Sequence, residues 1–149
     1  MKRNAEKEIN LKKLKKGVFL AVILGIIFDT KKRKILMGRR VNDPYISNLT
    51  WSFPGGVPNY GEDLEKFVER KIREKTNLKV KSLGCVFARE LKEKNKILLL
   101  YYLCEVVSGK ERPRDDLVEL KWVEPKDLEK YFTTSFDPRL KEYILNIKK

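Results

Sequence analysis

The sequence contains no histidine among its 149 residues and only two cysteines. Without histidine there is no Ser-His-Asp triad, no Cys-His pair and no imidazole metal ligand, so any chemistry must use carboxylates, lysines or metals held by oxygen atoms. Cys85 and Cys104 each lie inside an apolar run and lack the close spacing of a zinc or redox pair. The sequence therefore predicts buried free thiols in a reducing cytosol, and a cytoplasmic protein.

Long hydrophobic runs are also missing. The apolar stretch Val18 to Phe28 is too short to span a bilayer, and Asp29, Thr30 and Lys31 follow it where a signal peptide would carry a small-residue cleavage site. Its β-branched content favours a buried strand, and no membrane partner is expected. The length suits one domain with its own core, so we expect a basic N-terminal segment over 1–16 and a single domain over 17–149.

Acidic residues are too few to balance the basic ones. Lysine and arginine number 34 against 21 aspartates and glutamates, which gives a formal net charge of +13. Such a field attracts polyanions, namely nucleotides, nucleic acid or anionic membrane surfaces, and it also serves solubility. Composition leaves these alternatives open. The basic segment Met1 to Lys16 could be an arm or a tail.

Hydrophobic periodicity predicts an α/β domain. Strands are predicted over Val18–Phe28, Lys34–Gly38, Trp51–Phe53, Leu78–Arg89, Lys96–Val107 and Val118–Val123. The first two form a hairpin, and Lys96–Val107 is central because it is almost continuously apolar. Helices are predicted over Glu62–Thr76, closed by Asn77, over Pro125–Phe132 and over Pro138–Ile147. Turn formers at 42–44 and 47–48 predict a loop from Arg39 to Thr50 that carries Arg39, Arg40 and Tyr45.

Two lysines interrupt the apolar face of the helix predicted over Glu62–Thr76. Helical spacing puts Lys71 and Lys75 among Leu64, Phe67 and Val68. Either these long side chains reach out from the edge of the apolar stripe to water, or they face a recess that holds an anion or carboxylates from other strands.

From Gly56 onward the spacing resembles the signature of Nudix hydrolases, which cleave nucleoside diphosphates linked to another moiety. That signature is a Gly, five residues, a Glu, seven residues, then Arg-Glu, an aliphatic, any residue, Glu-Glu, any residue, Gly and an aliphatic. The matching positions are Gly56, Glu62, Arg70, Ile72, Glu74 and Leu78, whereas Lys71, Lys75 and Asn77 differ. Similar lead-in and flanking segments extend the resemblance over residues 17–132. It implies a Nudix-type α/β/α sandwich with a central mixed sheet, and a homodimer is possible.

The resemblance also implies roles for individual residues. Catalysis falls to Glu62, Arg70 and Glu74, with Glu62 and Glu74 as ligands of Mg²⁺ or Mn²⁺. Substrate binding falls to Arg39, Arg40, Tyr45, Gly55, Gly56, Lys71 and Lys75. In relatives, position 71 holds a metal ligand or base, and positions 74 and 75 hold further ligands. Protonated lysines cannot coordinate Mg²⁺, and loss of a catalytic acid or base slows a reaction by about 10² to 10⁴. Replacement carboxylates could come from Glu90, Glu105, Asp116 or Glu119.

Two functional hypotheses follow. The first is a Nudix protein acting on a nucleoside diphosphate-linked substrate, with weak or altered metal-dependent hydrolysis. The second is a non-catalytic module that binds nucleotide or RNA through Lys71, Lys75, Arg39 and Arg40, independently of metal and sensitively to salt. A purely structural role comes third, and the substrate itself stays open.

Overall fold

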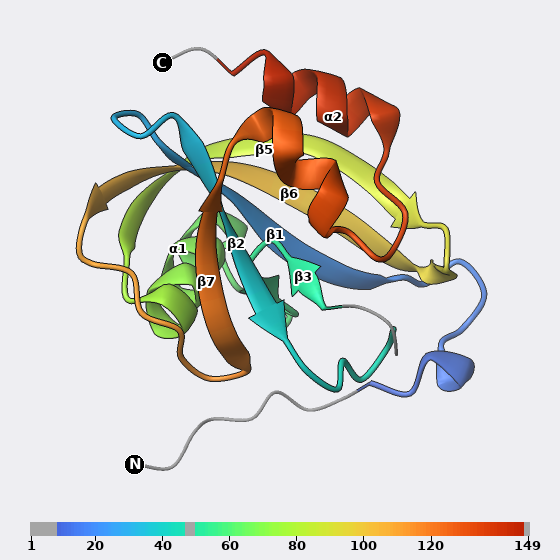
Figure 1. Cartoon of the computed structure of the whole chain (residues 1–149). Coiled ribbons are helices and arrows are strands. Elements are labelled where there is room, and N and C mark those ends of the chain that lie inside the picture. Colours follow the sequence, from blue (N-terminus) through green and yellow to red (C-terminus); the bar gives the residue numbers. More distant parts are fainter. Residues whose placement is uncertain (1–8, 47–49, 148–149) are drawn as a thin grey trace.

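A mixed β-sheet forms the centre of the molecule, which a computed structural model describes over residues 9–46 and 50–147 (Figure 1). The described strands are β1 (Leu20–Asp29), β2 (Lys34–Arg40), β3 (Trp51–Ser52), β4 (Gly55–Gly56), β5 (Lys79–Leu91), β6 (Lys94–Ser108) and β7 (Leu117–Val123). Their order is β3-β2-β1-β6-β5, with β4 paired to β1 and β7 paired to β2. β1 and β6 run parallel, and the other pairs are antiparallel.

The predicted strand pattern is confirmed at the centre of this sheet. β1 and β2 form the expected hairpin, in which Phe28 pairs with Ile35. β6 lies between β1 and β5, as its continuous apolar run predicts. Since both faces of β1 and β6 are covered, their side chains enter two separate hydrophobic clusters.

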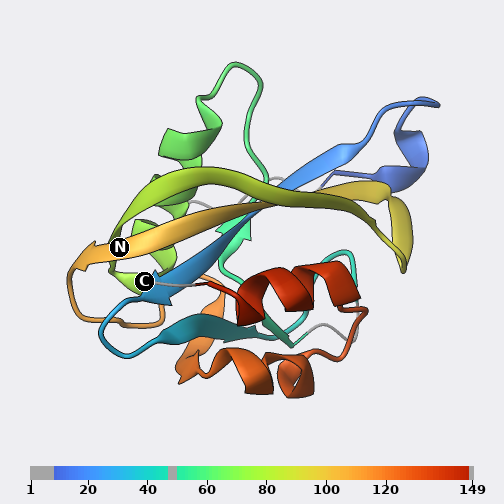
Figure 2. The ribbon, with the colours of Figure 1, turned by 90° about the horizontal axis from the view of Figure 1, so that it is seen from above.

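Helices cover both faces of the sheet, so the predicted α/β/α sandwich is confirmed (Figure 2). Helix α1 (Leu64–Thr76) packs Phe67, Val68 and Ile72 on one face. The 3₁₀ helix η2 (Pro125–Tyr131) and helix α2 (Pro138–Leu145) bury Leu128, Leu140 and Ile144 on the other. None of the described helices is long and apolar enough to cross a membrane.

Several predicted boundaries differ from the structure. Arg39 and Arg40 belong to β2 and not to the following loop, because they pair with Trp51 of β3 and with Glu119 and Leu117 of β7. The helix predicted from Glu62 begins at Leu64, because the Asp63 side chain caps it by accepting from two backbone N–H groups. The segment from Pro125 is a 3₁₀ helix, and the last helix ends at Leu145.

Some of the expectations fall on chain that lies outside the described residues. This holds for positions 1–8 of the basic segment predicted over 1–16 and for the turn formers Ser47 and Asn48. Within the described part of the basic segment, the short 3₁₀ helix η1 (Leu11–Lys13) lies beside the β5–β6 hairpin, where Lys96 Nζ donates to the Leu11 carbonyl oxygen at 3.1 Å. Leu11 and Leu14 pack against the core cluster, so this part of the segment is attached to the domain.

Asn77 replaces the glycine of the family pattern at a position that needs a left-handed backbone. It ends α1 with φ of 66°, a conformation that glycine adopts freely and asparagine tolerates. Its Nδ2 donates to the Lys110 carbonyl at 3.1 Å, and its Oδ1 accepts from Arg114 at 3.4 Å. This departure from the pattern therefore preserves the helix end and adds contacts to the loop before β7.

We expect Asn77→Ala to lower the free energy of unfolding by about 2 kcal/mol. Roughly half comes from the left-handed backbone and half from the lost side-chain hydrogen bonds. Asn77→Gly loses the hydrogen bonds but meets no left-handed penalty, so its loss should be smaller. Urea unfolding of the three proteins measures both values, and equal stabilities of the alanine and glycine variants would contradict this explanation.

The prediction of two buried thiols is wrong for Cys85. Cys104 is buried in β6, and burial raises the pKa of its thiol to about 12. Cys85 is exposed on β5, which is the last strand in the order of the sheet and has one face toward solvent. The apolar run around Cys85 does not distinguish such a strand from a central one.

A thiol reagent should therefore distinguish the two cysteines. At about pH 8 we expect one thiol per native chain to react rapidly and the second only in denaturant, because the thiolate is the reactive form and Cys104 is both buried and protonated. Absorbance of the released thiolate from Ellman's reagent gives the count. Rapid reaction in a Cys85→Ser variant would contradict the assignment.

Candidate functional site

A cavity of about 400 Å³ lies on the face of β1 and β6 against which η2 and α2 pack. Val22, Leu24, Leu99 and Tyr101 line it from the sheet. Its walls come from the segments 40–46, 52–57, 115–117 and 132–135. The first three segments contain or adjoin strands, and the fourth joins η2 to α2, so the sheet and the helices packed on it position all four around one space.

Two lysines of α1 line this cavity although α1 packs on the opposite face of the sheet. Lys71 and Lys75 are 8% and 6% exposed, which excludes extension of their amines into bulk water. Their side chains reach the cavity beside Gly55 and Gly56, which also line it. Of the two alternatives left by the sequence, the recess is therefore the correct one.

Each of these amines has an oxygen partner. Lys75 Nζ donates a hydrogen bond to the Gly55 carbonyl oxygen and lies 3.3 Å from Asp116 Oδ1. Lys71 Nζ lies 3.3 Å from Glu74 Oε1, one turn along the same helix. The cavity wall therefore holds two fixed positive charges whose counter-charges come from different elements.

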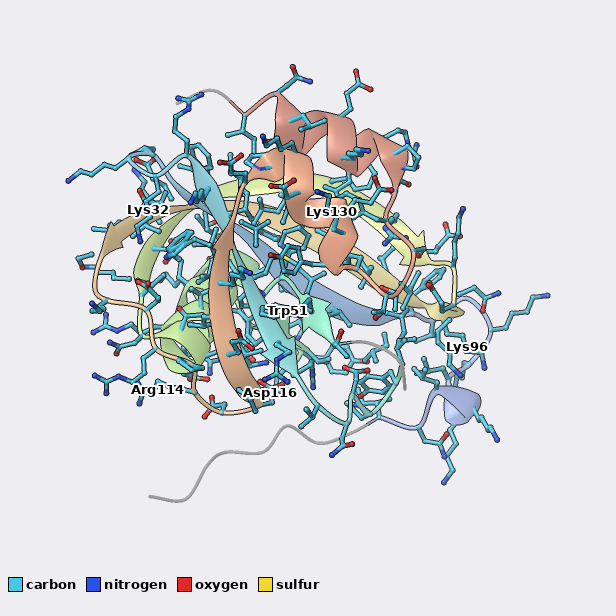
Figure 3. All side chains as sticks on the ribbon, in the orientation of Figure 1. Lys32, Trp51, Lys96, Arg114, Asp116 and Lys130 are labelled. Carbon is cyan, nitrogen blue, oxygen red and sulfur yellow. The ribbon has the colours of Figure 1, made fainter. Side chains whose placement is uncertain are left out.

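Arg40 adds a third cation to the same wall. Its guanidinium contacts Asp116 Oδ2 at 2.9 Å and Asp43 Oδ1 at 3.2 Å. Asp116 thus lies between Arg40 and Lys75, at the lower end of β7 beside the end of β2 (Figure 3). Arg39, predicted beside it, instead pairs with Glu119 at 2.9 Å and does not line the cavity.

Tyr45 and the two glycines also lie at the cavity. Tyr45 lines it, and its hydroxyl accepts from the backbone N–H of Ile9. Gly55 pairs with Leu24 of β1, and any Cβ there would collide with the carbonyl oxygen of Ile23. The glycine is required because β4 lies against the backbone of β1 at this point, and the Gly55 carbonyl accepts a hydrogen bond from Lys75.

The predicted catalytic residues lie together but outside the cavity lining. Arg70 contacts Glu62 at 2.8 Å and Glu74 at 3.1 Å. A backbone hydrogen bond from Asn59, together with Arg70, lowers the pKa of the Glu62 carboxyl. Both carboxylates are therefore engaged by the same guanidinium.

This donor set does not fit a divalent metal ion. Over residues 9–46 and 50–147, no cluster of three or more acidic or thiol side chains is placed to hold one. Glu74 has Arg70 and Lys71 beside it, and the cavity wall next to it carries ammonium groups where Mg²⁺ requires oxygen ligands.

Of the four replacement carboxylates considered, Asp116 lines the cavity. Glu119 is engaged by Arg39, while Glu90 and Glu105 lie on β5 and β6 outside the lining. The cavity also brings in Asp43 and Asp115, which sequence analysis did not single out as site residues. Their loops lack periodicity, so only the fold brings them together.

Aromatic side chains and one further cation also line the cavity. These side chains are Phe53, Tyr101 and Phe132. The ring centroid of Phe53 lies 6.0 Å from that of Tyr101 and 5.6 Å from that of Phe132. Arg89 donates to the Tyr101 hydroxyl at 3.3 Å and to the Ser135 carbonyl at 3.1 Å. Burial raises the pKa of Tyr101, so its hydroxyl stays protonated at neutral pH. The cavity therefore combines ion-paired cations with aromatic side chains, which suits a ligand that has both an anionic group and an apolar ring.

A mixed sheet between α1 and α2, with a glycine-containing crossing that opens onto a cavity at the end of α1, is an architecture of the Nudix type. The chain belongs to the NUDIX domain family, whose model matches residues 18–144.

Relatives and solved structures agree with this assignment. The chain is 31% identical over 127 residues to the ADP-ribose pyrophosphatase of Methanocaldococcus jannaschii, covering 83% of this chain and 73% of that protein. It is 32% identical over 112 residues to the 8-oxo-dGTP diphosphatase of Buchnera aphidicola, covering 74% and 81%. The MutT protein of Methanosarcina mazei has the same fold, with a TM-score of 0.70, 16% identity and coverage of 88% and 94%. So does the NUDIX domain of Shewanella oneidensis NrtR, solved with ADP ribose, with a TM-score of 0.64, 23% identity and coverage of 90% of each chain.

Proposed function

We propose that this chain binds a nucleoside diphosphate derivative in the cavity without needing a metal ion, and that any metal-dependent hydrolysis is slow. The observation that carries the proposal is the pair of buried amines, Lys71 and Lys75, in the cavity wall where the family pattern has acids. The diphosphate lies against these amines and Arg40, and the nucleoside extends toward the aromatic side chains of the lining.

Electrostatics supports this orientation of the ligand. A hydrogen bond to a charged group contributes about 1.5 to 3 kcal/mol, and lysine is a suitable point charge for phosphate. Low exposure of both amines limits screening by salt and water. ADP-ribose is the first ligand to test because the relative in Methanocaldococcus jannaschii is named for it.

Slow hydrolysis follows from the same residues. Mg²⁺ or Mn²⁺ would enter a wall that already carries Lys71 and Lys75, and the nearest family carboxylate, Glu74, is held by Arg70. Losing one catalytic acid or base lowers a rate by about 10² to 10⁴. Binding is thus the activity that the side chains favour.

Calorimetric titration with ADP-ribose tests the proposal directly. We expect comparable affinity in EDTA and in Mg²⁺ or Mn²⁺, an affinity that falls as salt rises, and little product by anion-exchange chromatography. Rapid product formation with metal, or affinity that appears only with metal, would contradict it. Absence of binding across a panel of nucleoside diphosphate derivatives would remove its basis.

RNA is a second candidate ligand, and for it we propose a surface other than Lys71, Lys75, Arg39 and Arg40, because exposed lysines gather elsewhere. Lys12 of η1 and Lys92, Lys94 and Lys96 of the β5–β6 hairpin surround one depression. We expect labelled single-stranded RNA to bind there with strong salt dependence. Lys92→Glu with Lys94→Glu should weaken RNA binding about tenfold and leave ADP-ribose binding unchanged, as measured by fluorescence anisotropy and calorimetry. The two charge reversals would have no effect on RNA if the cavity were its binding site.

A two-fold homodimer also belongs to the proposal. Light scattering of the purified chain tests it, and the mass of a single chain at micromolar concentration would contradict it.

A further inference from the structure

The amine of Lys75 lies among oxygen atoms of the kind that hard metal cations select. Its Nζ donates to the Gly55 carbonyl oxygen and lies 3.3 Å and 3.4 Å from the two carboxylate oxygens of Asp116. Backbone carbonyls and carboxylates are typical ligands of Mg²⁺ and Mn²⁺ in proteins. Lys75 is 6% exposed, so its charge belongs to the cavity wall and not to the outer surface.

We infer that the Lys75 ammonium is a tethered cation that takes the place of a divalent metal ion, with Gly55 and Asp116 as its oxygen ligands. The assignment of the cluster is argued from the contacts just described. Its role in facing the phosphate of a bound ligand rests on the proposed function.

Asp116 gives independent support because one of its oxygen atoms depends on a cation. Its Oδ2 is engaged by Arg40 at 2.9 Å. Its Oδ1 is buried and accepts no hydrogen bond from the described part of the chain, and Lys75 Nζ lies 3.3 Å from it. A buried carboxylate oxygen without a donor is unfavourable, so a cation is required at this point.

The backbone holds Asp116 in place independently of Lys75's side chain. Two N–H groups of the loop before β7, from Arg112 and Arg114, donate to the carbonyl oxygens of Thr76 and Lys75 at 2.8 Å and 3.0 Å. These bonds join the loop to the last turn of α1 through backbone atoms. Asp116 therefore stays beside position 75 when the side chain there is changed.

The spacing of the cluster suits an ammonium group better than a metal ion. Mg²⁺ binds its oxygen ligands at about 2.0–2.1 Å, whereas the Asp116 oxygens lie 3.3–3.4 Å from Nζ. A covalently attached cation is present at every metal concentration. Ligand binding that depends on it should therefore be insensitive to chelators.

The test is to exchange the tethered cation for a ligand and to titrate the full chain with Mn²⁺ alone, without nucleotide. Lys75→Glu adds a third oxygen donor beside Gly55 and Asp116. Electron paramagnetic resonance of free Mn²⁺ should show one new site, with affinity at least about tenfold above wild type, and Lys75→Glu with Asp116→Asn should lose about tenfold or more of it. Lys66→Glu is the matched control, since it makes the same charge change at an exposed position of α1 and should gain nothing.

Three results would overturn the inference. One is a wild-type chain that binds Mn²⁺ as tightly as Lys75→Glu. Another is a folded Lys75→Glu chain, with wild-type circular dichroism, that gains no site. A third is a gain that survives Asp116→Asn. Should Lys75→Glu fail to fold, Lys75→Gln removes the charge without adding one, and a folded glutamine variant with no more Mn²⁺ affinity than wild type would equally overturn the inference.

This outcome is separable from that of the proposed function. Wild-type binding of ADP-ribose in EDTA tests the ligand, whereas the Mn²⁺ titration contains no ligand. If the wild-type chain binds ADP-ribose but Lys75→Glu gains no Mn²⁺ site, the inference about Lys75 is wrong and the proposed function stands. If Lys75→Glu gains a Mn²⁺ site but the wild-type chain does not bind ADP-ribose, the proposed ligand is wrong and the inference about Lys75 stands.

Discussion

Changing Lys71 and Lys75 together to glutamate should lower the affinity for ADP-ribose in EDTA by about 10²- to 10⁴-fold. Two charge-assisted contacts of about 1.5 to 3 kcal/mol each are lost, and every 1.4 kcal/mol corresponds to a factor of ten. The new carboxylates also repel the diphosphate in a cavity wall with little solvent exposure. Isothermal titration calorimetry in the presence of chelator gives the affinity.

The control for this experiment carries the same change in net charge outside the cavity. Lys66 and Lys79 are exposed and do not line the cavity, so Lys66→Glu with Lys79→Glu should change affinity only slightly through the long-range field. Equal losses in the two double variants would mean that general charge, and not the cavity amines, attracts the ligand. Thermal unfolding of each variant excludes loss of structure as the cause.

Gly55→Ala should destabilise the fold by about 3 kcal/mol or more, at the upper end of overpacking effects. A Cβ at this position would overlap the Ile23 carbonyl oxygen and crowd the Leu24 backbone. Backbone atoms of a central strand cannot move away as a side-chain end can, so β4 would separate from β1. The Gly55 carbonyl would then leave Lys75, and ligand affinity should fall together with stability.

Gly38→Ala provides the comparison for this substitution. Its Cβ would meet the end of the Leu117 side chain at 2.8 Å, and that side chain can rotate. We therefore expect a loss of about 1 kcal/mol, measured with Gly55→Ala by urea unfolding. Equal losses in both variants would show that backbone contact at Gly55 has no special weight.

The sequence predicted the main elements because their signals are local. β1, β6 and α1 follow from apolar runs and helical spacing, and these signals survive in any environment. The same spacing placed Lys71 and Lys75 on the apolar side of the helix but left open whether they extend to water or face a recess, and their burial decides for the recess. The family spacing from Gly56 to Leu78 also predicted the architecture, since it depends on the order of residues along the chain.

Boundaries were less predictable where strand pairing overrides local turn signals. Arg39 and Arg40 precede strong turn formers, yet pairing with β3 and β7 extends β2 through them. Likewise Glu65 and Glu69 have the spacing of solvent-facing helix charges, but both accept hydrogen bonds from Ser82 of β5. All these contacts join residues of different elements, so local patterns carry no trace of them.

By itself the sequence determined a Nudix-type sandwich, the position of two lysines on the apolar side of a helix and the absence of histidine chemistry. Only the tertiary structure decided that the buried amines line a cavity and that Asp116 is the carboxylate beside Lys75. Asp116 lies 41 residues beyond Lys75, and it reaches that amine because the loop before β7 is hydrogen-bonded to the end of α1. The interaction energy of two charges depends on the distance between them in space, and the packing of whole elements sets that distance, whereas spacing along the chain does not.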